Sequence, residues 1–159
     1  MKYSRFEDLP VWQDAIELAV RVFALTTLPC FRRHSGTRNQ LENAVVSISN
    51  NIAEGFERGT TQETLTFLYI ARGSAGEVRS MFCFLERADC FKELRSEIPD
   101  LRSRALSISK QLRAWAESMQ NSDIRGQRYL TDKSRRITQE ARERAEFLKE
   151  LDEVRKRKP

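Results

Sequence analysis

The sequence predicts an all-α fold, an antiparallel up-down four-helix bundle followed by a charged helical extension. Three observations support this prediction. Apolar residues recur at three- and four-residue spacings over four segments, helix-capping signals separate these segments, and no two segments show the alternation of paired strands. The chain has 159 residues, 40% of them hydrophobic, which is enough for one well-filled core. We therefore expect a bundle over residues 1–120 and a basic helical extension over residues 121–159.

The first predicted helix begins at Asp8, a favourable N-cap, and has Pro10 in its first turn, where proline's missing N–H costs no hydrogen bond. The pair Leu28–Pro29 is expected to end it. Its apolar positions follow helical spacing. They are Val11, Trp12, Ala15, Ile16, Leu18, Ala19, Val22 and Phe23.

The second predicted helix follows a linker over residues 30–36. Thr37 and Gln40 match a capping box, in which a hydroxyl and an amide satisfy free backbone N–H groups. Gly55 is expected to end the helix in a left-handed conformation. The apolar stripe between these points consists of Leu41, Ala44, Val45, Ile48 and Ile52.

The third predicted helix has a capping box at Thr60–Glu63 and a heptad-type seam. Gly73 and Gly76 lie inside it, and each costs about 1 kcal/mol relative to alanine. Such glycines predict the close approach of another backbone. The seam consists of Phe67, Ala71, Ser74, Val78, Met81, Leu85 and Ala88, widened by Leu68, Ala75 and Phe82.

The fourth predicted helix follows a break at residues 89–99 and again alternates three- and four-residue steps. Its seam consists of Ile98, Leu101, Ala105, Ile108, Leu112, Trp115 and Met119. Four helices with such seams and short links favour an antiparallel bundle.

The extension differs from the bundle in charge and in aromatic content. Residues 1–120 hold 16 Lys and Arg against 15 Asp and Glu, whereas residues 121–159 hold 12 against 8. Twelve of the 14 aromatic residues precede position 121. We expect residues 121–126 to form a linker, and a helix with a thin apolar stripe to follow from about Thr131 and to be ordered against a partner.

The residues required for catalysis or metal binding are largely missing. His34 is the one histidine, and no carboxylate nearby is placed to orient it as a base. Phe31 stands where a Glu-x-x-His di-iron motif needs glutamate, and the three cysteines form no CxxC pair. We therefore expect no enzyme activity, no cofactor and no metal. Reduced thiols, and the absence of a signal peptide or of an apolar run of about 20 residues, predict a cytoplasmic protein without membrane contact.

The charge pattern suggests nucleic-acid binding, because clustered lysines and arginines neutralise phosphates and release counterions. The alternative is a solvated charged helix, since acids are interspersed with the bases of the extension. Tyr129 beside Arg135–Arg136 adds a ring on which a base can stack. The candidate phosphate contacts are Arg32, Arg33, Arg38, Arg125, Arg128, Lys133, Arg135, Arg136, Arg142, Arg144, Arg155, Lys156, Arg157 and Lys158.

Three stretches of the chain carry a family resemblance. They are FEDLPVWQDA at residues 6–15, AVVSISNNIAEGFERG at 44–59 and FLYIARGSAGE at 67–77. In this order and at these separations they resemble the 23S ribosomal RNA intervening-sequence protein family, also called four-helix bundle proteins, over residues 5–120. The family usually has proline where this chain has Ser49, and the loss of that proline is expected to straighten the second helix.

The resemblance implies a cytosolic bacterial bundle that assembles as a homopentamer. It also implies kinship with the accessory variability proteins of diversity-generating retroelements, similar pentamers that bind nucleic acid and a reverse transcriptase. No catalytic residues come with it. The signature positions are Asn51, Glu54, Gly55, Arg72, Gly73, Ser74 and Glu77, which we interpret mainly as structural, with Glu54, Arg72 and Glu77 as a candidate charge network at a buried or interfacial position.

Two functional hypotheses follow. The first is a non-enzymatic, oligomeric accessory protein that binds nucleic acid, RNA or an RNA–DNA hybrid in particular, with a reverse transcriptase as a candidate partner. The second is a protein-only assembly scaffold, in which the C-terminal helix docks on a neighbouring subunit or on a partner protein.

Overall fold

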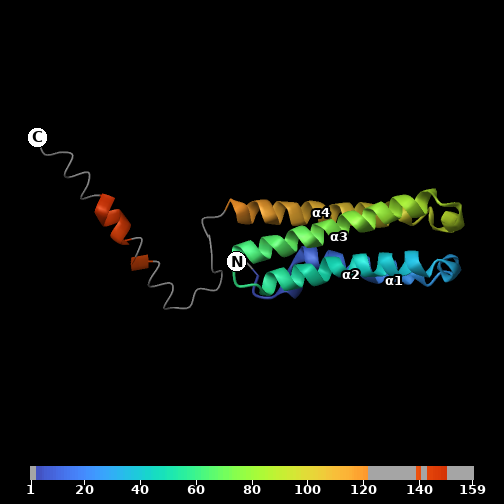
Figure 1. The fold of residues 1–159 in the computed structure, drawn as a ribbon, viewed down its shortest axis with the longest axis horizontal. Helices are drawn as coiled ribbons and strands as arrows, with labels where there is room; N and C mark the ends of the chain where they lie inside the picture. The colour runs from blue at the N-terminus through green and yellow to red at the C-terminus, as the bar shows by residue number, and fades with distance from the viewer. Residues whose placement is uncertain (1–2, 122–138, 141–142, 150–159) are drawn as a thin grey trace, which may run out of the picture. The chain divides into compact units, whose positions relative to one another are not determined.

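The computed structural model describes residues 3–121, 139–140 and 143–149. The prediction of an all-α helical bundle is confirmed. The described residues include four long helices joined by short links (Figure 1). A 3-10 turn precedes α1, and two of the three links between the helices contain another. The elements are η1 (Phe6–Asp8), α1 (Pro10–Thr26), η2 (Pro29–Arg33), α2 (Ser35–Glu57), α3 (Thr61–Arg87), η3 (Asp89–Leu94) and α4 (Ile98–Gln120).

The four long helices pack as a square, in which α1 and α3 each contact both α2 and α4. Hydrogen bonds and ion pairs between neighbours run in opposite sequence directions, so these neighbours are antiparallel. The pairs are Asp14–Gln111 and Arg21–Asp100 between α1 and α4, Gln40–Glu77 and Ser47–Ser74 between α2 and α3, and Tyr69–Gln120 and Glu86–Arg102 between α3 and α4.

One hydrophobic core runs along the bundle from Leu9 to Ala116. The four-residue and three-residue steps of the predicted stripes place one face of each helix in it, since residues so spaced share a helical face. Phe31 and Phe91, from η2 and η3, pack with ring centroids 5.0 Å apart. Both rings are buried, so the two 3-10 turns add to the core at the end of the bundle where they lie.

Two predicted helix starts are wrong. Asp8 belongs to η1, and the N-cap of α1 is Leu9, which has no side-chain cap, although Pro10 does occupy the first turn as predicted. The helix α2 begins at Ser35, so Thr37 lies inside it and caps nothing. In both cases a 3-10 turn precedes the helix, and neither Asp8 nor Thr37 makes the predicted capping hydrogen bond. The cap at Thr60 is confirmed, because its hydroxyl accepts from the backbone N–H of Glu63.

The predictions for the glycines also need correction. Gly55 does not end α2, which continues to Glu57. Instead Gly55 is buried where α2 and α3 approach each other closely. Gly73 and Gly76, in contrast, do not lie at a close helix contact, since a methyl group on either would meet no atom within 4 Å. Among the described residues, no other backbone approaches them.

The helix α2 is continuous across Ser49, the position of the missing proline. The hydroxyl of Ser49 donates to the carbonyl oxygen of Val46 at 3.1 Å, so this buried polar group is satisfied inside the helix.

Some residues that the periodicity assigned to the core lie at the surface. On α1, Ile16 is 36% exposed and Phe23 is 44% exposed, and Val20 between them is 61% exposed. Together with Gln13 and Thr27 they follow steps of three and four residues, as in a second heptad seam. We call Gln13, Ile16, Val20, Phe23 and Thr27 the outer seam of α1.

The chain divides into two compact units, residues 1–126 and 127–159. In the second unit, the described residues 139–140 and 143–149 are helical, as expected for the extension. Phe147 and Leu148 on this helix are exposed.

Candidate functional site

The predicted basic linker lies at η2 and the start of α2. Arg32 and Arg33 occupy the last turn of η2, and both side chains are exposed. Among the described residues neither has an ion-pair partner. Their positive charges are therefore available to an anion.

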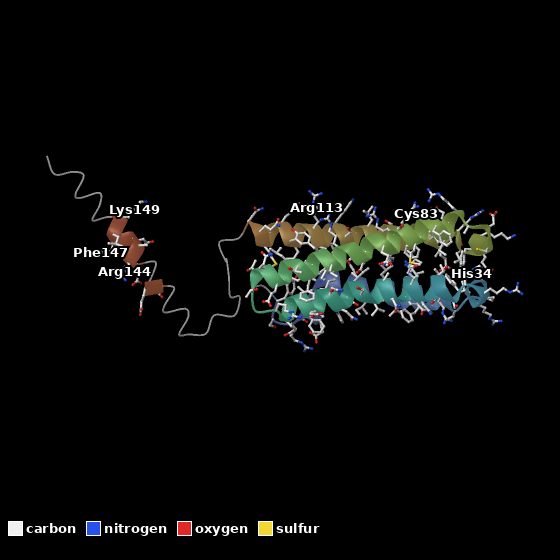
Figure 2. The ribbon with its side chains drawn as sticks, in the orientation of Figure 1. His34, Cys83, Arg113, Arg144, Phe147 and Lys149 are labelled. Atoms are coloured by element: carbon white, nitrogen blue, oxygen red, sulfur yellow. The ribbon has the colours of Figure 1, made fainter. Side chains whose placement is uncertain are left out.

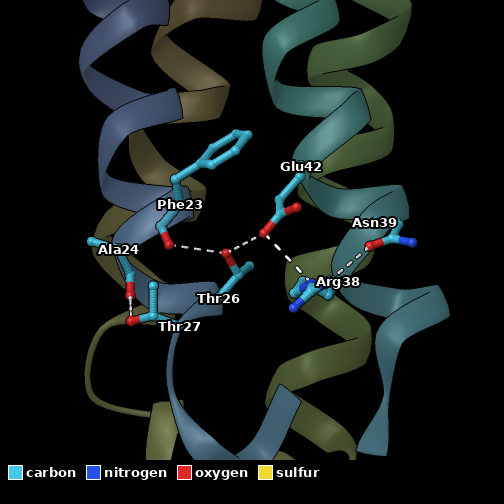
Figure 3. Close-up of polar contacts among 7 residues, drawn as sticks. All are labelled: Phe23, Ala24, Thr26, Thr27, Arg38, Asn39 and Glu42. Carbon is cyan, nitrogen blue, oxygen red and sulfur yellow. Dashed lines mark hydrogen bonds and ion pairs between the residues drawn. The ribbon is translucent and has the colours of Figure 1, made fainter. Parts of the chain in front are cut away.

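Arg38, the third predicted base of this cluster, differs from its neighbours (Figure 3). Its guanidinium lies 3.9 Å from the carboxylate of Glu42, and it donates to the side chain of Asn39 at 3.5 Å. Glu42 also accepts from the hydroxyl of Thr26 at 2.6 Å, so it links α2 to α1. Because Glu42 offsets part of its charge, Arg38 is the weakest of the three candidates for a phosphate contact.

His34, the one histidine, and Cys30 belong to the packing at this end of the bundle. The imidazole of His34 lies 5.0 Å from the ring of Phe91, centroid to centroid. Burial, and after it a hydrogen bond with Glu93, together raise the pKa of the Cys30 thiol to about 11. A thiol with so high a pKa is a poor nucleophile at neutral pH.

The signature residues Asn51, Ser74 and Glu77 lie along the contact between α2 and α3. The hydroxyls of Ser74 and Ser47 are 2.9 Å apart, and Asn51 donates to the carbonyl oxygen of Ser47 at 2.7 Å. Glu77 accepts from Gln40 at 3.1 Å. The bonds of Ser74 and Glu77 join α3 to α2, whereas the bond of Asn51 lies within α2. All three bonds support the structural interpretation of these residues.

The predicted charge network of Glu54, Arg72 and Glu77 is not formed within this chain. Glu54 pairs with Arg58, four residues later on the surface of the same helix. Arg58 also lies over the ring of Phe67, 4.6 Å from its centroid. Helical spacing explains the difference, because the i,i+4 pair is available locally.

Two further signature residues, Arg72 and Gly73, are exposed on α3. Arg72 has no partner among the described residues. It therefore contributes a free positive charge to the surface of α3.

Of the bases predicted in the extension, Arg144 is described and is exposed on its helix (Figure 2). The other extension residues on that list lie outside the described residues. They are Arg125, Arg128, Lys133, Arg135, Arg136, Arg142, Arg155, Lys156, Arg157 and Lys158.

Two other kinds of site are absent from the part of the chain that the structure describes. No three His, Cys, Asp or Glu side chains gather there in a way that would hold a metal ion. None of the described helices combines the length and the apolar content needed to span a bilayer.

Sequence reasoning missed two surfaces. One is the outer seam of α1, whose Ile16 and Phe23 were grouped with the core stripe because helical periodicity does not distinguish an inward from an outward apolar position. The other surface is a groove between α3 and α4, which Arg79 and Arg102 both line. These arginines are 23 positions apart, and neither belongs to a basic run in the sequence.

The fold and its surface define a class of protein, a small helical bundle with exposed arginines and an exposed apolar stripe. The family model for the 23S rRNA-intervening sequence protein matches residues 7–114. The chain belongs to the 23S rRNA-intervening sequence protein family.

A solved structure with the same fold comes from Bacteroides thetaiotaomicron and is described as a protein of unknown function from the S23 ribosomal protein family. The two chains are 21% identical, with a TM-score of 0.60. The match covers 67% of this chain and 98% of that one. No functionally curated protein matches the sequence.

Proposed function

We propose that this protein is a non-enzymatic, oligomeric accessory protein that binds nucleic acid, RNA or an RNA–DNA hybrid in particular. The observation that carries the proposal is the pair Arg32 and Arg33, two exposed guanidinium groups without ion-pair partners among the described residues. Exposed cations of this kind bind phosphates and release counterions.

Self-association of the protein would strengthen its binding to nucleic acid, because each copy adds one basic cluster. The outer seam of α1 supports it, because a heptad-spaced apolar stripe on a helix surface is typical of helix–helix contact. The family resemblance suggests a homopentamer. Five copies of one weak basic cluster would bind a long polyanion with an avidity that exceeds the affinity of each by orders of magnitude. A reverse transcriptase is the candidate protein partner, again by kinship.

The test is fluorescence anisotropy with a structured RNA and a matched DNA duplex, at about 50 and 200 mM salt, a range that weakens binding through several phosphates by roughly a thousandfold. Three proteins are compared: the full chain, the R32Q/R33Q variant, and a chain ending at residue 120. The shortened chain keeps every residue of the core. We expect tight, salt-sensitive binding by the full chain and weaker binding by R32Q/R33Q. If the full chain retains neither RNA nor DNA at low salt, the proposal is wrong.

The second candidate is a protein-only scaffold, and the described helix of the extension favours it. Phe147 and Leu148 are exposed there, side by side in the sequence, as in a helix that docks on another protein. The chain ending at residue 120 separates the two candidates. Loss of the oligomer or of a protein partner favours the scaffold, whereas loss of nucleic acid alone favours the accessory protein.

A further inference from the structure

A groove of about 600 Å³ lies between α3 and α4, away from the linker arginines. It is open to solvent and takes residues from both helices. Its lining consists of Gly76, Arg79, Ser80 and Cys83 on α3, and Pro99, Arg102, Ser103 and Leu106 on α4.

The groove has two cationic side chains and no carboxylate in its lining. Arg79 has no ion-pair partner among the described residues. Arg102 is held in place by Glu86, whose carboxylate accepts from its Nη1 at 2.6 Å. Arginine has five N–H donors, so the Nε and Nη2 groups of Arg102 still offer hydrogen bonds to a ligand.

The other lining residues suit the rest of such a ligand. The hydroxyls of Ser80 and Ser103 are exposed and have no protein partner in the described part of the chain. Leu106, Pro99 and Cys83 provide an apolar surface beside them. Arginine forks and hydroxyls hydrogen-bond phosphate oxygens, while apolar surface accepts sugar and base faces.

Cations continue along both helices beyond the groove. Arg72 lies seven residues, and so about two turns, before Arg79 on α3. Lys110 lies seven residues after Ser103 on α4, and it too is exposed without a partner among the described residues. Residues seven apart share a helical face. The positive charges therefore form a track along α3 and α4, which suits a chain of phosphates better than a single phosphate.

We propose that the α3/α4 groove binds the phosphodiester backbone of a single-stranded nucleic acid, with Arg79 and Arg102 on the phosphates and Gly76 leaving room for the strand. This inference rests on the proposed function and assigns it a site on the bundle itself, distinct from Arg32 and Arg33. The apolar surface of Leu106 and Pro99 takes the sugar or base next to the bound phosphate.

The first arm of the test removes charge. Binding of a fluorescein-labelled single-stranded uridine oligomer of about 20 nucleotides, long enough to cover a binding site, is measured by anisotropy with the full chain. At about 0.1 M salt, R79Q should weaken binding roughly fivefold, and should reduce the slope of log K against log salt by about 0.7, the value for one phosphate contact on a single strand. The matched control is K92Q, an exposed lysine on η3 outside the groove, which should bind as wild type.

The second arm blocks the groove without changing charge. A side chain at Gly76 enters the groove, whereas one at Gly73 on the same helix does not line it. A Cβ at either position has open space, so both variants should fold, and loss of glycine from a helix interior favours folding. We expect G76L to weaken binding of the uridine oligomer at least tenfold, and G73L to leave this binding unchanged. Sedimentation of each variant shows whether its oligomeric state has changed.

The third arm predicts a gain. E86Q releases Arg102 from its carboxylate partner, and should strengthen binding twofold or more if Arg102 contacts phosphate. If R79Q, G76L and E86Q all bind as wild type while R32Q/R33Q loses binding, the groove is not the site and the proposed function stands. If the wild-type chain does not bind the uridine oligomer at low salt, both the proposed function and the groove site are wrong.

Discussion

Gly55 on α2 lies directly against Phe67 on α3. A methyl group at Gly55 would be 2.8 Å from the Cβ of Phe67 and 3.3 Å from the carbonyl oxygen of Thr64. Real Cβ atoms do not approach so closely, and both obstacles belong to the adjacent helix close to its backbone. The glycine therefore permits the close approach of α2 and α3 at this point.

We predict that G55A destabilises the protein by about 1–3 kcal/mol, the usual cost of overpacking, although alanine is the better helix former. The matched control is G73A, where the new methyl group meets no atom within 4 Å. It should stabilise by up to about 1 kcal/mol. Urea denaturation of the two variants measures both effects. A more stable G55A would show that α2 and α3 separate without cost.

The outer seam of α1 provides a second prediction. V20E places a charge on a side chain that is 61% exposed, so the bundle should fold as before while the proposed oligomer dissociates. A114E places the same charge on an exposed alanine of α4, and should leave the oligomer intact. Sedimentation equilibrium, read against the 18.6 kDa of one chain, gives the assembly state of each. Equal masses for V20E and wild type would exclude this stripe from the interface.

The thiols should differ in reactivity. Cys30 has a pKa of about 11, because burial and its hydrogen bond with Glu93 oppose the thiolate, whereas Cys90 is exposed. At neutral pH we expect Cys90 to react with an aromatic disulfide reagent well before Cys30 does, since the thiolate is the reacting form. Peptide mapping of the labelled chain identifies the modified residue. C90S should lack the fast phase, and a fast phase that persists in C90S would contradict the assignment.

Asp100 should make stability depend on pH. Hydrogen bonds from Arg21 and then Arg104 hold the pKa of Asp100 below its usual 3.8. A carboxylate with a lowered pKa in the folded state stabilises it fully above the unfolded pKa, and loses that effect as pH falls through the folded value. D100N should therefore melt slightly below wild type at neutral pH, and the gap should narrow in acid. E17Q, on an exposed acid without a partner among the described residues, is the control and should show no gap at either pH.

The site could be predicted only in part. The basic linker was visible in the sequence because Arg32 and Arg33 are adjacent, and adjacency survives folding. Arg79 and Arg102 were not, because each is an ordinary charged position on a helical face until α3 and α4 pack together. The predicted charge network of Glu54, Arg72 and Glu77 was wrong for a related reason. Spacing indicates which residues of one helix are neighbours, but not which partner a side chain selects across helices.

The sequence by itself determined the four helices, most of the faces that they bury and the short links between them, since heptad spacing and local signals such as Pro10 and the Thr60 cap act over a few residues. The tertiary structure decided the rest. It placed Gly55 inside a helix contact, turned the outer seam of α1 to the surface and assembled the α3/α4 groove. Each of these depends on contacts between residues far apart in the chain, which no local pattern encodes.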